Sequence, residues 1–108
     1  MIRVNVYKSG KGKIRGFKCL GHAEYADAGE DIVCAAVSML VINTVNSIQT
    51  FLPEEYITVN DDQESGLLEC YFEDEPSDQA ALLLDSMLLG LKSVEENYQG
   101  NYLKVEDC

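Results

Sequence analysis

A helix is predicted over residues 31–50, which read DIVCAAVSMLVINTVNSIQT. Its apolar positions recur at spacings of three and four residues, the period of one helix face. Additional alanines and an isoleucine make the segment apolar nearly all round, which predicts a largely buried helix. The recurring positions are Val33, Val37, Leu40, Val41, Thr44, Val45 and Ile48, and the additional ones are Ala35, Ala36 and Ile42.

Short segments on both sides of this helix predict two β-hairpins. Residues 2–7 alternate between apolar and polar side chains, and residues 13–20 return after a turn rich in lysine and glycine. After the helix, residues 56–60 and 67–72 form a similar pair around an acidic turn. Each hairpin therefore lies next to one end of the buried helix.

A second helix is predicted to begin near residues 76–78, because proline and acidic residues suit a helix start. Gly100 fits the left-handed position after its end, and residues 102–105 form a final strand. The order ββαββαβ predicts an α+β fold with two helices packed on a mainly antiparallel sheet. The apolar stripe of the second helix consists of Ala80, Leu84, Met87, Leu88, Leu91, Val94 and Tyr98.

The length of 108 residues fits a single domain over residues 1–108. No apolar run reaches the roughly 20 residues of a membrane span, so no membrane partner is expected. The first residues alternate too quickly for a signal peptide, which favours a cytoplasmic location. In that compartment Cys19, Cys34, Cys70 and Cys108 are expected to be reduced thiols.

The net charge of −11 is unevenly distributed. Six of the eight basic residues lie in the first eighteen positions, and the chain is strongly acidic from Glu24 onward. Such a surface repels a phosphate backbone, so no direct nucleic-acid partner is expected. It attracts basic peptides and proteins, although acidic residues that only confer solubility are the alternative.

His22 and Cys34 are the candidate catalytic pair. His22, the only histidine, ends the second predicted strand, and Cys34 lies in the first turn of the predicted helix. Unpaired N–H groups and the helix dipole at that position favour the thiolate form, which is the reactive form of cysteine. The same N–H groups suit a developing oxyanion. An imidazole within folding distance would complete a nucleophile–base pair.

Two polar residues could support this pair. Asp31 is expected to cap the helix, and its alternative role is to orient His22. Ser38 follows Cys34 by one helical turn and so lies on the same face. Its hydroxyl either hydrogen-bonds the thiolate or the imidazole, or bonds back to the carbonyl of Cys34.

The segment before the helix is predicted to be a mobile loop over residues 21–30. Gly21 and Gly29 bracket it, and a loop that opens and closes would admit a peptide. Ala23 and Tyr25 are its other candidate substrate contacts.

A zinc site is a competing interpretation. Cys19 and His22 have a Cys-x-x-His spacing, and Cys34 and Cys70 would complete four ligands. Only one pair is close in sequence, so no metal or other cofactor is expected.

The stretch Gly21-His22-Ala23, followed by Gly29-x-Asp31-Ile32-Val33-Cys34-Ala35-Ala36-Val37-Ser38, resembles the signature of the ribosomal-processing cysteine protease family, Prp. The resemblance extends over the whole chain in length and element order. It implies a cysteine endopeptidase that removes the N-terminal extension of large-subunit ribosomal protein twenty-seven after an aromatic pair, as ribosome assembly requires.

The resemblance also implies the roles of individual residues. Cys34 and His22 match the family's Cys–His dyad, Ser38 matches a further active-site position, and residues 22–31 match a mobile loop that orders around the substrate peptide. Family members are typically homodimers. The rival interpretation from another class is a non-catalytic acidic module that binds basic ribosomal proteins or peptides.

Overall fold

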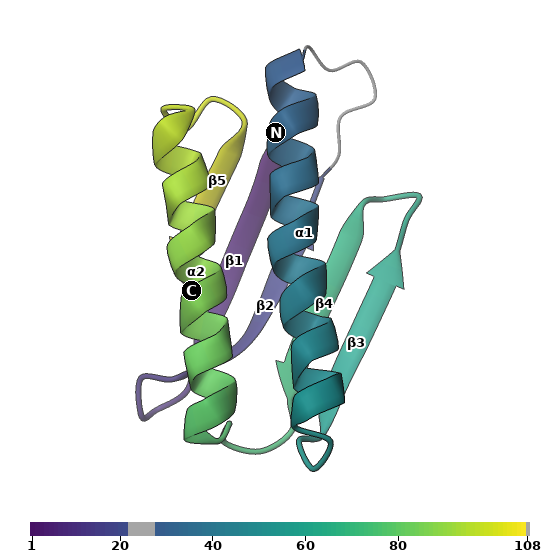
Figure 1. Cartoon of the computed structure of the whole chain (residues 1–108), viewed down its shortest axis with the longest axis vertical. Helices are drawn as coiled ribbons and strands as arrows, with labels where there is room; N and C mark the ends of the chain where they lie inside the picture. The colour runs from purple at the N-terminus through teal and green to yellow at the C-terminus, as the bar shows by residue number, and fades with distance from the viewer. Residues whose placement is uncertain (22–27, 108) are drawn as a thin grey trace.

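Two helices cover one face of a five-stranded sheet in the computed structural model, which describes residues 1–21 and 28–107 (Figure 1). The order ββαββαβ confirms the predicted α+β fold. The strands are β1 (Ile2–Lys8), β2 (Ile14–Leu20), β3 (Ile57–Asp62), β4 (Leu67–Phe72) and β5 (Leu103–Asp107), and the helices are α1 (Ala28–Phe51) and α2 (Asp78–Asn97).

The sheet has the strand order β3-β4-β2-β1-β5. Its pairs are antiparallel except β1 with β5, which run parallel. Two hairpins account for β1–β2 and β3–β4, while β2–β4 joins strands separated in sequence by α1 and β3. This last pairing brings the two hairpins side by side and places the β3–β4 turn near the end of β2.

The core lies between the sheet and the helices. Alternate residues of β1 are buried against them, with Ile2, Val4 and Val6 at most 1% exposed. The helices also approach each other closely, because a Cβ atom on Gly90 of α2 would lie 2.8 Å from the side chain of Leu40. Four members of the predicted stripe of α2 are buried, namely Ala80, Leu84, Met87 and Leu91, and the other three are partly buried.

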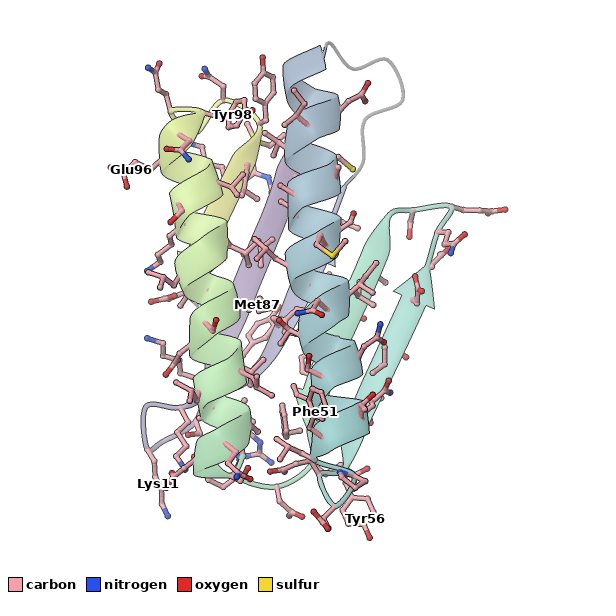
Figure 2. The ribbon with its side chains drawn as sticks, in the orientation of Figure 1. Lys11, Phe51, Tyr56, Met87, Glu96 and Tyr98 are labelled. Carbon is pink, nitrogen blue, oxygen red and sulfur yellow. The ribbon has the colours of Figure 1, made fainter. Side chains whose placement is uncertain are left out.

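Helix α1 differs from its prediction at its start and on its outer side. It begins at Ala28 instead of Asp31, so Asp31 is not the N-cap. Ile32 and Met39 are more than half exposed, which contradicts the expected burial of nearly the whole circumference. The reason is architectural, because two helices on one face of a sheet leave their outer sides to solvent. Phe51 and Tyr56 are also exposed, near the far end of α1 (Figure 2).

Residues Asp31–Phe51 of α1 have the length and composition of a membrane span. The sequence expectation that no segment does so was therefore wrong. An apolar helix of this kind occurs both in membranes and in the core of soluble domains. Here its inward face packs in the core, where Val33, Val37, Val41 and Ile48 are at most 2% exposed.

Candidate active site

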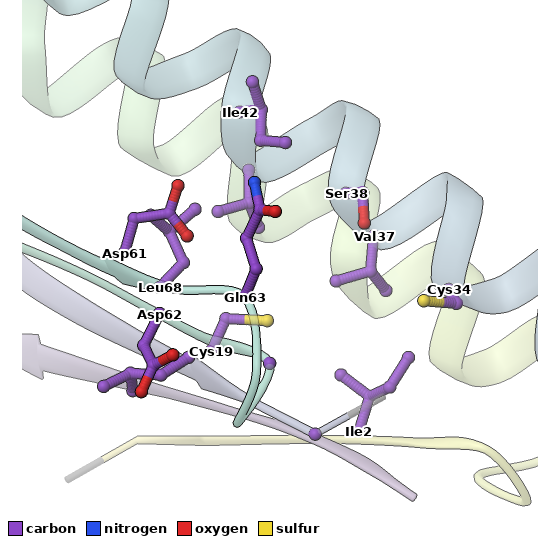
Figure 3. Close-up of a pocket in the computed structure, with 14 residues that line it drawn as sticks. Ile2, Cys19, Cys34, Val37, Ser38, Ile42, Asp61, Asp62, Gln63 and Leu68 are labelled. Carbon is purple, nitrogen blue, oxygen red and sulfur yellow. The ribbon is translucent and has the colours of Figure 1, made fainter. Parts of the chain in front are cut away.

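A pocket of about 240 Å³ lies between the first half of α1 and the β3–β4 hairpin (Figure 3). Cys34 and Ser38 line it from α1, and Cys19 lines it from β2. Gln63 of the β3–β4 turn lines the opposite wall. The pocket therefore lies between the predicted nucleophile and the β3–β4 hairpin, which follows it in the sequence only after the end of α1.

Cys34 lies one turn further into α1 than predicted. With Ala28 as the first helical residue, Cys34 is in the second turn. A rise of 1.5 Å per residue places the residues of the first turn about 4.5 to 9 Å away along the axis. The unpaired N–H groups belong to that first turn, and the dipole acts mainly there. The prediction that Cys34 lies in the first turn was wrong for this reason, while oxyanion binding by these groups stays a prediction.

Gly21 fixes the direction in which the chain leaves β2. Its φ of 114° is accessible to glycine, and a Cβ at this position would lie 2.6 Å from the carbonyl oxygen of Met1. Its N–H donates to the carbonyl of Gly66 in the β3–β4 turn at 3.3 Å. Gly21 also lines the pocket that contains Cys34. The residue directly before His22 is thus held at the pocket edge by two other segments.

The described residues do not include His22, Ala23 or Tyr25, so these three predicted site residues lie outside the structure described here. Gly29 is described, and it lies in the first turn of α1. The predicted loop boundary at Gly29 was therefore wrong, because the helix begins before it.

Ser38 points into the pocket beside Cys34 (Figure 3). Thr44 of α1 donates its hydroxyl hydrogen to the carbonyl four residues earlier, at 2.7 Å. Among the described residues, Ser38 makes no such bond to the carbonyl of Cys34. The predicted back-bond is therefore not found in the described part of the chain, while a hydrogen bond of Ser38 to the thiolate or the imidazole stays a prediction.

Sequence reasoning missed the wall opposite Cys34. Asp61, Asp62 and Gln63 line the pocket from the end of β3 and the turn, and Leu68 lines it from β4. The sequence predicted the acidic turn of the second hairpin, but it did not indicate that this turn lies beside Cys34. The signal needed was the pairing of β2 with β4, in which Cys19 lies opposite Leu68.

The four proposed zinc ligands are not assembled by the described residues. Cys19 lines the pocket, whereas Cys70 is fully buried in the core. The described part of the chain contains no group of three or more histidine, cysteine, aspartate or glutamate side chains that could hold a metal ion. Burial raises the pKa of both Cys19 and Cys70 to about 11, so both side chains are neutral thiols near neutral pH.

Comparison with known proteins identifies relatives along almost the whole chain. The family model of cysteine protease Prp matches residues 1–103. The ribosomal processing cysteine protease Prp of Staphylococcus aureus is 35% identical over 101 residues, which cover 94% of each chain.

Solved structures share the fold. The essential ribosomal processing protease Prp of S. aureus, in complex with a substrate peptide, superposes with a TM-score of 0.90 at 30% identity over both full chains. The same protein with a covalently linked product peptide gives a TM-score of 0.86 at 31% identity, again over both full chains.

Proposed function

The chain belongs to the cysteine protease Prp family, and we propose that it removes the N-terminal extension of large-subunit ribosomal protein twenty-seven. Family membership makes it a cysteine protease and disfavours the non-catalytic module. One observation carries the proposed site: Cys34 and Gly21, the residue before His22, line the same pocket.

The proposed mechanism is acyl transfer through a Cys34–His22 dyad. His22 removes the proton of Cys34, and the sulfur attacks the scissile carbonyl to form an acyl-enzyme. His22 then protonates the leaving amine, and water releases the acyl group. The Ser38 hydroxyl, directed into the pocket one turn after Cys34, donates a hydrogen bond to the thiolate or to the oxyanion formed there.

The shape and lining of the pocket support an aromatic residue at the cleavage site. Its volume of about 240 Å³ is below the roughly 300–1,000 Å³ of pockets for drug-sized ligands, and so suits one large side chain. Apolar side chains form much of the lining, among them Ile2, Val37, Val41 and Leu68. An aromatic ring next to Cys34 would remove this surface from water.

Charge supports the choice of a basic protein substrate. The chain carries a net charge of −11, and Asp61 and Asp62 line the pocket on the β3–β4 side. A basic extended segment would be attracted to this wall, whereas ribosomal RNA would be repelled. A homodimer and a cytoplasmic location, which the resemblance and the sequence predict, belong to the same proposal.

The test is incubation with N-terminally extended ribosomal proteins, read by mass spectrometry. We expect a cut in ribosomal protein twenty-seven after its aromatic pair, and loss of that cut when the pair is replaced by alanines. Cys34→Ala should abolish cleavage by removing the nucleophile. Cys70→Ala is the matched control, because Cys70 is buried outside the pocket.

Two results would contradict the proposal in different ways. Full activity of Cys34→Ala would remove the mechanism. If the wild type cleaves other extended proteins but not ribosomal protein twenty-seven, the proposed substrate is wrong.

A further inference from the structure

Cys19 lies in the same pocket as Cys34, and the proposed reaction does not use it. We propose that Cys19 is a resolving thiol: peroxide oxidises Cys34, and Cys19 converts the product into a Cys19–Cys34 disulfide that switches the enzyme off reversibly. The inference rests on the nucleophilic role proposed above for Cys34.

The two sulfur atoms reach the pocket from different layers of the fold. Cys19 is near the end of β2 and packs against the core, while Cys34 comes from α1 above it. Figure 3 shows both sulfur atoms directed into the pocket. No other described cysteine lines this pocket, since Cys70 lies in the core.

The causes of the raised pKa also distinguish Cys19 from Cys70. Burial is the main reason that each has a pKa raised to about 11. For Cys19, the negative charge on Cys34 raises the pKa further, whereas Cys70 has no such contribution. A negative charge on Cys34 would therefore be close enough to affect the ionisation of Cys19.

The chemistry takes two steps and one molecule of peroxide. The Cys34 thiolate attacks hydrogen peroxide, so that an S–O bond forms, the O–O bond breaks and hydroxide leaves. Cys19 then loses its proton and attacks the Cys34 sulfur, so that an S–S bond forms, the S–O bond breaks and a second hydroxide leaves. The two hydroxides take up the two thiol protons, so two thiols and one peroxide give one disulfide and two waters.

The disulfide would protect the nucleophile. Without a neighbouring thiol, the sulfenic acid of Cys34 is exposed to further oxidation to the sulfinic acid, which is irreversible in most proteins. A disulfide instead returns to two thiols when a dithiol reductant is added.

The experiment compares peroxide inactivation of the wild type, Cys19→Ala and Cys70→Ala, each relative to its own untreated activity. All three should be inactivated. Dithiothreitol should restore most of the activity of the wild type and of Cys70→Ala. The fraction of activity restored in Cys19→Ala should be at least tenfold smaller. Peptide mapping should find a Cys19–Cys34 disulfide in the first two proteins, and a Cys34 peptide with two added oxygens in Cys19→Ala.

The pH dependence adds a second readout. The thiolate fraction of a group with a pKa of about 11 rises about tenfold per pH unit between roughly pH 7 and 9. Disulfide formation from the sulfenic acid should accelerate accordingly. This rate is measured by trapping unreacted sulfenic acid with dimedone at timed intervals.

Equal recovery of the wild type and Cys19→Ala, with no Cys19–Cys34 peptide pair, would overturn the inference. Such a result leaves the protease proposal intact if the untreated wild type cleaves its substrate. Conversely, a mapped disulfide in a protein without peptidase activity would contradict the proposed function and not the thiol pairing.

Discussion

The two helices pack on the same face of the sheet but contribute different kinds of residues. Helix α1 lines the pocket with Cys34, Ser38 and three apolar residues, whereas none of the described pocket residues comes from α2. Helix α2 instead has a defined start, where the hydroxyl of Ser77 accepts a hydrogen bond from the N–H of Ala80 at 3.1 Å. The difference indicates that α1 serves the site and α2 the stability of the domain, which substitutions on each helix can test.

The largest expected effect is on stability, from Leu84→Ala in α2. Leu84 is fully buried, and a leucine-to-alanine change in a core costs about 2–5 kcal/mol. Urea unfolding should show this loss, while the folded protein keeps wild-type kcat/KM because α2 does not line the pocket. A large change in kcat/KM of the folded fraction would show that α2 also contributes to the active site.

A smaller effect is expected on catalysis, from Ser38→Ala in α1. Loss of one hydrogen bond at the site should lower kcat/KM about tenfold, equivalent to about 1.4 kcal/mol. The midpoint of urea unfolding should not change, because Ser38 is exposed. Ser86→Ala is the matched control, because Ser86 is an exposed serine on α2. This substitution should change neither kcat/KM nor the midpoint of urea unfolding. A loss as complete as that of Cys34→Ala would show that Ser38 takes a direct part in the chemistry.

The smallest effect is expected from Ser77→Ala at the start of α2. Removing an N-cap hydroxyl typically costs about 1 kcal/mol, because one N–H of the first turn loses its partner. Ser77→Asp should restore most of the stability, since a carboxylate also accepts this hydrogen bond. Peptidase activity should be unchanged in both variants. Equal stability of Ser77→Ala and the wild type would show that this cap contributes nothing measurable.

The start of α2 was predictable because its signals are local. Pro76, Ser77 and Asp78 are consecutive, and the structure uses Ser77 as the cap, so that Pro76 precedes the helix and does not lie in its first turn as expected. Lys13 adds an ion pair to Asp78 at 2.8 Å, which sequence proximity does not reveal. The start of α1 was not predictable in the same way, because Asp31 has the side chain of a cap but lies inside a helix that begins at Ala28.

The site was predictable only in part for a related reason. Cys34 and Ser38 share a helix face by spacing alone, and the pocket confirms that they lie together. Asp61, Gln63 and Leu68 reach the same pocket only through the pairing of β2 with β4. Such pairings join segments distant in sequence, and the alternation of each strand does not specify its partner.

The parallel pairing of β1 with β5 affects the order in which the protein folds. Ile2 lines the pocket and lies opposite Leu103, in the last strand along the chain. During synthesis, β1 can pair with β2 early, but its other edge stays open until β5 has been made. Contacts of such high contact order form late and slowly. The pocket would therefore be complete only after β5 has been synthesised and has paired with β1.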